Sequence, residues 1–241
     1  MNFKKDAWNK KDIKEFDKYL ESIKVPEKID FSKKTVNTQM EVLGMNLPTC
    51  KDIAKKIHEG NFNSFLENND FKYYENTQIS AFLINYIKPA DEKKKYIDSL
   101  YMDNWATVDT LKYKIKGQEE EFLKLAKTYI KSKETFKRRV GVRILFSYTS
   151  PEYTKEVFKI MDSLYKEKEY YVNMAVAWLG CELMIKCRKE FLAYLKHHHL
   201  NDFTINKTIS KCRDSFRVSD EDKEYLLKYK KWNFWGHSPK V

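Results

Sequence analysis

Glycine and proline are scarce in this chain. Six glycines and five prolines make up under 5% of the 241 residues, where an average chain carries about 12%. Strand-rich and α/β folds use these residue types in their tight turns, so the shortage argues against barrels, sandwiches and doubly wound sheets. It also argues against a flexible linker to a second domain. We therefore expect an all-α fold in one domain spanning residues 1–241, with residues 1–30 and 230–241 as its terminal caps.

Cysteine is also rare, and long apolar runs are missing. The four cysteines form no C-x-x-C pair and no zinc-type spacing with histidine, so we expect reduced thiols and neither a metal nor a cofactor. No apolar run approaches the roughly 20 residues that a membrane helix needs. The N-terminal residues contain no apolar segment of the kind that signal peptides have. These absences lead us to expect a soluble, cytoplasmic, monomeric protein without membrane contacts.

Arginine is scarce although the chain is strongly basic. The formal net charge is +11, yet only 6 of the 46 basic residues are arginine. A positive excess favours polyanionic partners, because binding to phosphates releases their condensed counterions. A lysine-rich surface that is simply solvated gives the same total. Since arginine forms bidentate contacts with phosphate and carboxylate groups, the positions of the six arginines are more informative than the net charge.

Apolar residues recur with helical periodicity along most of the chain. Residues Ser150 and Pro151 are typical of a helix start, and Tyr153, Val157 and Ile160 then share one face. We expect about a dozen helices joined by short polar turns, among them residues 73–88, 104–116, 134–148 and 168–186. Helix pairs that recur every roughly 35–45 residues are typical of a curved α-α superhelix (solenoid) of HEAT-like repeats, with a compact bundle as the alternative. The concave face of such a solenoid suits a long polyanion.

The helix expected over residues 104–116 combines an indole, a carboxylate and two ammonium groups. On one face it carries Trp105, Asp109, Lys112 and Lys116. The opposite face is apolar and supplies the contact with the core. A tryptophan and a carboxylate thus stand together where folding does not require them. They form either a functional site or a surface tryptophan beside a solvated Asp–Lys pair.

Three of the six arginines lie within six residues, and Arg139 and Arg143 share a face of the helix expected over 134–148. Clustered arginines in an arginine-poor chain indicate recognition of phosphate or carboxylate groups, and a solvated basic face is the alternative. In the helix expected over 168–186, small alanines leave room beside Trp178. An aromatic stripe at this spacing is also typical of a core, so this helix by itself leaves both interpretations open.

Taken in order, these segments resemble one family. The W-x-x-x-D motif that ends at Asp109, the following Gly117, the R-R-hydrophobic helix and the run Y-Y-V-x-x-A-V-A-W that ends at Trp178 are similar to the AlkD-like DNA alkylation-repair glycosylases. The turn Leu43-Gly44-Met45 resembles the L-G-I/V turn of that family. The resemblance covers roughly residues 35–230.

The resemblance implies an enzyme of base excision repair. Members stack HEAT-like repeats, hold double-stranded DNA in a basic concave groove and hydrolyse the N-glycosidic bond of positively charged alkylated purines, such as N3-alkyladenine and N7-alkylguanine. They need no metal and act without a deep pocket for the base. For this chain the resemblance implies a cytoplasmic, nucleoid-associated hydrolase. The alternative is a non-catalytic HEAT-like scaffold that binds DNA structures or a protein partner.

By position, the resemblance gives roles to individual residues. Asp109 is the catalytic carboxylate, Trp105 and Trp178 are the aromatic residues beside it, and Arg139 holds the DNA backbone. A carboxylate suits this chemistry because the departing purine leaves positive charge on the sugar. Apart from the resemblance, the side of the helix on which they are expected predicts phosphate contacts for three further residues, Lys112, Lys116 and Arg143.

Three positions differ from the family pattern. Asn46, a DNA-binding position, is a shorter amide than the glutamine of the best-known members. Thr35 falls near a position that is aromatic in some members, and Phe136 replaces a tryptophan before the arginine pair. The residues that would carry the chemistry are all retained, which favours an active enzyme.

Two further features are interpreted as structural. The run His197-His198-His199 has no cysteine or carboxylate at ligand spacing and is expected in a solvated turn. The C-terminal residues Trp232, Phe234 and Trp235 form an aromatic, basic tail that we expect to dock on the last helices.

Overall fold

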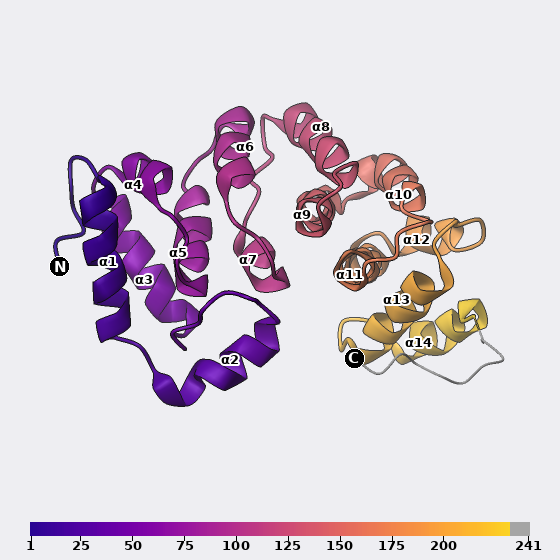
Figure 1. Cartoon of the computed structure of the whole chain (residues 1–241). Helices are drawn as coiled ribbons and strands as arrows, with labels where there is room; N and C mark the ends of the chain where they lie inside the picture. Colours follow the sequence, from indigo (N-terminus) through magenta and orange to yellow (C-terminus); the bar gives the residue numbers. More distant parts are fainter. Residues whose placement is uncertain (232–241) are drawn as a thin grey trace. The chain divides into compact units, whose positions relative to one another are not determined.

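The structure is a computed structural model that describes residues 1–231; the aromatic tail containing Trp232, Phe234 and Trp235 lies outside the described residues. The chain divides into two compact units, Met1–Tyr129 and Ile130–Val241 (Figure 1), and each is described by itself. Over residues 1–231 the regular structure is helical, with one isolated bridge between Glu41 and Tyr73 and no strand. The all-α prediction is confirmed, whereas the single domain over 1–241 stays a prediction. No helix in this part of the chain combines the length and hydrophobicity needed to span a bilayer.

The first unit is built from short helices that pack on their neighbours. They are α1 (Lys10–Ser22), α2 (Ile29–Val36), α3 (Leu47–His58), α4 (Phe62–Asn68), α5 (Tyr74–Ile84), α6 (Ala90–Ser99), α7 (Trp105–Thr110) and α8 (Glu119–Ile130), which ends where the second unit begins. Asparagine side chains accept backbone N–H groups at the starts of α1, α3, α4 and α7, which explains where these helices begin. The sequence pattern did not predict α2, because Val36 is its only buried residue and no apolar stripe is visible.

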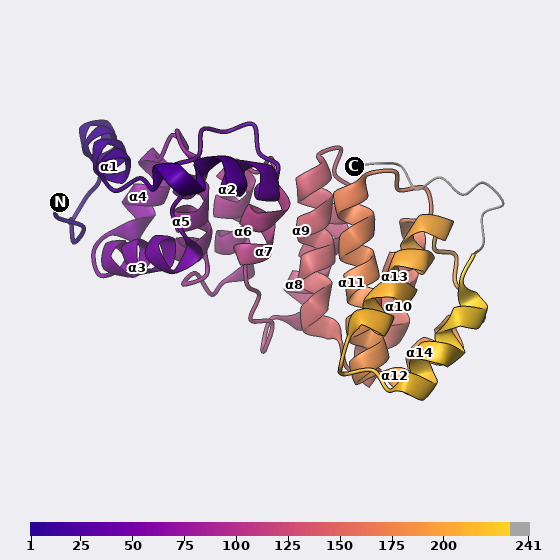
Figure 2. The same cartoon turned by 90° about the horizontal axis from the view of Figure 1, so that it is seen from below.

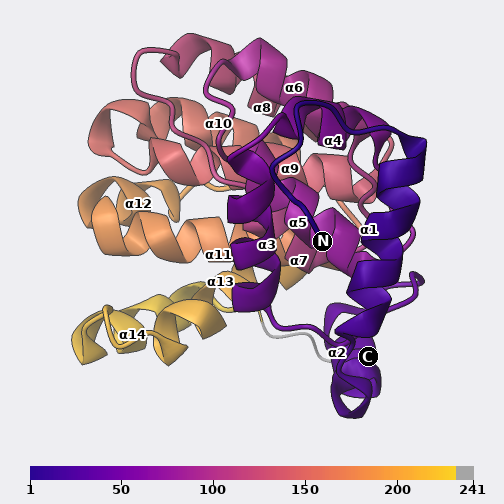
Figure 3. The same cartoon turned by 90° about the vertical axis from the view of Figure 1, so that its left-hand side faces the viewer.

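Helix α5 lies at the centre of the first unit. It packs against α3 and α7, and the three helices lie side by side in Figure 1 and one behind another in Figure 3. Ten of its 11 residues are buried, and polar side chains occupy five of these positions: Glu75, Asn76, Thr77, Gln78 and Ser80. All five form hydrogen bonds within the unit. Because buried polar groups must be paired to be tolerated, these bonds specify how the neighbouring helices sit on α5.

The second unit is organised around its longest helix. Its helices are α9 (Thr135–Leu145), α10 (Thr154–Ser163), α11 (Tyr170–Lys186), α12 (Arg188–Tyr194), α13 (Asp202–Asp214) and α14 (Asp220–Leu226). Helix α11 lies between α9 and α13 and also packs on α12 (Figure 2). In both units the strongest packing joins alternate helices, α3 with α5 in the first and α9 with α11 and α11 with α13 in the second. This stacking confirms the predicted helical-repeat fold.

Arg138, which precedes Arg139 on α9, takes part in the packing of the second unit. Its guanidinium binds the Glu167 carboxylate through two hydrogen bonds, with Nε 2.6 Å from Oε2 and Nη2 3.2 Å from Oε1, and both side chains are largely buried. Burial acts to raise the pKa of the Glu167 carboxyl, but the hydrogen bonds from Arg138 and from the backbone of Glu169 and Lys168 outweigh it and hold the pKa below its ordinary value. The pair therefore joins α9 to the turn before α11.

Replacing Arg138 should destabilise the protein in a pH-dependent way. We expect Arg138→Gln to lower the free energy of unfolding by about 3 kcal/mol at pH 7, because it leaves the Glu167 carboxylate buried without its partner. Because the pKa of Glu167 is lower in the folded protein than in the unfolded chain, its ionisation stabilises the fold at pH values above the ordinary glutamate pKa of about 4.3. This stabilisation is lost as the pH falls through the pKa that Glu167 has in the folded protein. The difference between wild type and variant should therefore narrow below about pH 4.

Urea unfolding followed by circular dichroism at a series of pH values measures this difference. The control is Lys223→Gln, which breaks the exposed Lys223–Asp220 pair (3.0 Å) in the same unit and should change stability little. A loss for Arg138→Gln that is the same at pH 3 and pH 7 would contradict the ionic origin of the effect.

Candidate functional site

Trp105 and Asp109 lie one turn apart on α7, and α5 holds this helix in place. Thr107, on the buried side of α7, has its hydroxyl 2.8 Å from the Thr77 hydroxyl and accepts a hydrogen bond from the Gln78 amide at 3.0 Å. Trp105 and Asp109 are both half-buried. The sequence prediction that these two residues share a helical face is therefore confirmed, and the helix that carries them is bonded to a buried helix.

The Trp105 indole is fixed on two sides. It packs against the apolar cluster formed by Val36, Met40, Val42, Tyr74 and Ala106. Its Nε1–H donates to the backbone carbonyl of Thr35, at 3.3 Å, at the end of α2. Thr35, the position that is aromatic in some members of the resembled family, thus contacts Trp105 through its main chain.

Lys112 and Lys116 do not lie on the face of α7, because this helix ends at Thr110. Asn85, just beyond α5, binds the backbone where the helix would continue: its Nδ2 donates to the Thr110 carbonyl (2.9 Å) and its Oδ1 accepts from the Lys112 N–H (2.7 Å). The prediction of a single helix over 104–116 is wrong beyond Thr110, since the Asn85 side chain, just beyond α5, takes over the hydrogen bonds.

The sequence did contain a signal for this change. Residues 111–116 read Leu-Lys-Tyr-Lys-Ile-Lys, and strict alternation of apolar and polar residues indicates an extended segment rather than a helix. In the structure the segment is not helical, Leu111 is buried, and the three exposed positions are Lys112, Lys114 and Lys116. Because the helical prediction places Lys114 off the face of Trp105 and Asp109, it did not identify this residue as part of the exposed lysine row.

Asn46 and the turn before it are positioned by hydrogen bonds inside the first unit. The Asn46 Oδ1 caps α3 by accepting from the backbone N–H and the hydroxyl of Thr49, both at 2.9 Å. The preceding turn is held by the fully buried Glu75 carboxylate, which accepts from the Leu43 N–H at 3.0 Å and the Met45 N–H at 3.2 Å. Burial raises the pKa of Glu75, and these backbone hydrogen bonds partly offset the shift.

Arg143, Phe146 and Trp178 form a cation–aromatic cluster in the second unit. The Arg143 guanidinium lies 4.2 Å from the centre of the Phe146 ring and 4.7 Å from that of Trp178. The two rings meet edge to face, 5.1 Å apart. Trp178 is 37% exposed although its neighbours on α11 are buried. It is therefore not a core residue, which favours the functional interpretation.

Arg139 has a different environment from Arg143. It is only 5% exposed, and its Nη1 donates to the backbone carbonyl of Tyr171 at the start of α11. The arginine that the resemblance places on the DNA backbone is thus built into the packing of α9 on α11. The structure places two groups of predicted residues: Trp105 with Asp109 in the first unit, and Arg143 with Trp178 in the second. Asn46, Lys112 and Lys116 lie on other segments of the first unit.

Comparison with models of protein families shows which family the chain is related to. The family model described as DNA alkylation repair enzyme matches residues 16–211. The chain belongs to this family. The match contains every site residue predicted above, and it confirms the resemblance stated from the sequence. Membership supports a role in DNA repair, which in turn indicates that the protein binds DNA. No curated protein matches the chain.

Proposed function

We propose that this protein is a DNA glycosylase that removes positively charged alkylated purines, such as N3-alkyladenine and N7-alkylguanine, from double-stranded DNA. The observation that carries the proposal is a carboxylate, Asp109, one helical turn from Trp105 in a member of the DNA alkylation repair enzyme family. The protein would act as a cytoplasmic monomer on the nucleoid, without a metal.

The chemistry requires little from the protein. A cationic purine leaves as a neutral base with the electrons of the C1′–N bond, and positive charge develops on the sugar. The Asp109 carboxylate would stabilise that charge and accept a proton from the water that adds to C1′. The face of the Trp105 indole attracts a nearby cation by about 0.5–2 kcal/mol. Since Trp105 is fixed by packing and by the Thr35 carbonyl, little freedom would be lost on binding.

The Arg143 cluster would contribute to DNA binding. Stacking engages the flat face of the guanidinium, whereas its N–H donors lie in its plane and are suited to phosphate oxygens. Because Nε and Nη1 are buried, a contact with phosphate would be made through Nη2. The rings of Phe146 and Trp178 restrict the orientation of Arg143, so a contact with phosphate would cost less side-chain entropy.

Release of bases from methylated duplex DNA tests the function. The wild-type protein is incubated with the DNA, and free methylated purines are quantified by chromatography. Release of N3-methyladenine or N7-methylguanine without strand cleavage is the expected result. Tight DNA binding without any release would contradict the glycosylase and favour the non-catalytic scaffold.

Replacing Arg143 should weaken DNA binding and its dependence on salt. We expect Arg143→Gln to raise the Kd for a short duplex several-fold and to reduce the slope of log K against log salt by about 0.9, the value for one phosphate contact. Fluorescence anisotropy at a series of salt concentrations measures both quantities. The control is Arg213→Gln, which removes the same charge from an exposed position on α13. Equal effects of the two substitutions would show that only net charge matters.

A further inference from the structure

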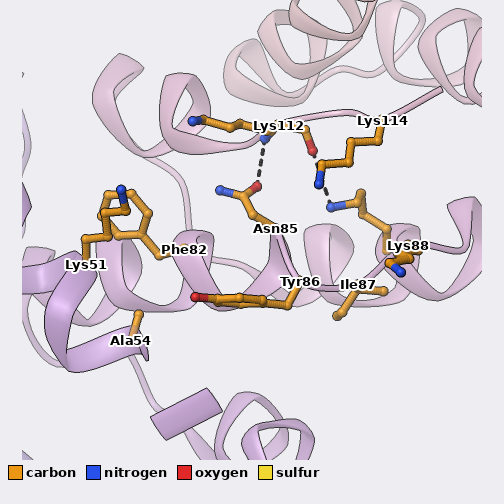
Figure 4. A pocket seen from close by; sticks show the side chains of 10 residues that line it. Lys51, Ala54, Phe82, Asn85, Tyr86, Ile87, Lys88, Lys112 and Lys114 are labelled. Atoms are coloured by element: carbon orange, nitrogen blue, oxygen red, sulfur yellow. Dashed lines mark hydrogen bonds between the residues drawn. The ribbon is translucent and has the colours of Figure 1, made fainter. Parts of the chain in front are cut away.

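A pocket of about 360 Å³ opens in the first unit, away from Trp105 and Asp109. It lies among α3, the end of α5, α6 and the segment that follows α7 (Figure 4). This volume falls within the range of ligand sites, roughly 300–1,000 Å³. Half of its ten lining residues are lysines: Lys51, Lys88, Lys93, Lys112 and Lys114. None of these described lining residues carries a carboxylate, so the pocket is strongly cationic.

The other side of the pocket is aromatic. Phe82 is the one residue of α5 that is not buried, and Tyr86 follows shortly after this helix. The Tyr86 ring is stacked on His58, with ring centres 3.6 Å apart and planes inclined by 18°, and this contact holds it in place. Figure 4 shows the Tyr86 ring edge-on along one side, with Lys112 and Lys114 on the opposite side. The pocket thus offers both ring surfaces and positive charge.

Lys93 carries one of these charges into the interior of the unit. It is only 2% exposed, and its ammonium group donates to the carbonyls of Ile84 (2.7 Å) and Lys112 (3.3 Å). Burial, together with the positive charge of Lys114, lowers the pKa of Lys93 to about 8. Gathering like charges in this way destabilises the free protein, and a bound anion would offset that cost.

We propose that this pocket binds a nucleotide unit, with its base against the aromatic side and its phosphate among the lysines. Base–aromatic stacking accepts any base, and lysine ammonium groups bind phosphate as point charges. The same chemistry is presented by a free nucleotide and by the phosphorylated end of a DNA strand. The inference goes beyond the proposed base removal, because the pocket contains neither Trp105 nor Asp109.

Calorimetric titration of the full chain tests the proposal with three probes: adenosine monophosphate, adenosine and inorganic phosphate. We expect the nucleotide to bind at least tenfold more tightly than either fragment, because only it engages both sides of the pocket. Lys114→Gln should weaken nucleotide binding at least fivefold. The matched control is Lys14→Gln, which removes the same charge from an exposed position on α1 outside the pocket. It should leave the nucleotide affinity unchanged.

A competition experiment distinguishes the two sources of the ligand. Displacement of the bound nucleotide by a 5′-phosphorylated duplex, lost when the phosphate is removed, would identify a DNA end, and no displacement would identify a free nucleotide. The proposal is overturned if phosphate alone binds as tightly as the nucleotide, if the nucleotide does not bind, or if Lys114→Gln and Lys14→Gln have equal effects. Circular dichroism checks that both variants are folded. These outcomes do not depend on whether the protein removes bases.

Discussion

Asp109→Asn should lower the rate of base release from methylated duplex DNA at least a hundredfold. Asparagine has nearly the same shape as aspartate but no negative charge, so it cannot stabilise the positive charge that develops on the sugar. Removing one preorganised electrostatic contact of this kind typically costs about 10²–10³ in rate. The rate is measured under single-turnover conditions, with protein in excess over DNA, so that product release does not limit it.

DNA binding separates a catalytic role of Asp109 from a structural one. Because the substitution removes a negative charge from a DNA-binding protein, the affinity for undamaged duplex should stay the same or rise slightly. The control Asp52→Asn makes the same change at an exposed position on α3 and should keep full activity. Equal rates for wild type and Asp109→Asn would contradict the assigned role.

Gly44→Ala should strongly destabilise the first unit. Gly44 has φ +79°, and a Cβ there would lie 2.4 Å from the Val25 carbonyl oxygen and 3.1 Å from the Ile29 nitrogen. The backbone cannot easily move away, because the Val25 N–H donates to the Leu43 carbonyl (2.8 Å) and Glu75 holds the other side of the turn. Strain from positive φ and the steric clash together should lower the free energy of unfolding by about 3–5 kcal/mol.

Gly117→Ala provides a matched control for this prediction. Gly117 has almost the same backbone conformation, φ +78°, but nothing lies within 4 Å of an added Cβ. Gly117→Ala should therefore lower the free energy of unfolding only by the cost of the positive φ angle, about 1–2 kcal/mol. Urea unfolding of both variants measures the difference, which isolates the clash at Gly44. Similar losses at the two positions would show that the turn can adjust, and that its packing against Val25 and Ile29 is looser than the contacts indicate.

The helical elements could be predicted largely from local patterns. Apolar spacing and the helix start at Ser150 and Pro151 indicated where helices run, because both signals act within a few residues of the chain. The Ser150 side chain nevertheless forms no capping hydrogen bond, and a 3₁₀ turn over Pro151–Tyr153 precedes α10. Helix α2 escaped this approach since it buries little. Asp109 and Trp105 were predicted correctly as neighbours because one helical turn fixes their spacing.

The candidate site depended more on contacts between distant residues. Arg139 and Arg143 are equivalent by helical spacing, yet one is buried against the Tyr171 carbonyl and the other stacks on Trp178. Spacing gives the side of a helix on which a residue lies, but not which partner covers that side. The exposure of Trp178 likewise follows from the helices around α11 rather than from the composition of α11 itself.

The sequence by itself determined the fold class, the family and the pairing of Trp105 with Asp109. These features follow from residue type and short-range periodicity, which do not depend on which distant segments pack against them. The alternation in residues 111–116 indicates an extended segment, but only the tertiary structure decided which contacts end α7 and what the lysines beyond it do. Asn85, 25 residues away from Thr110, competes for the backbone hydrogen bonds that would have extended the helix. It thereby turns Lys112 away from the Asp109 face and into a lysine-rich pocket.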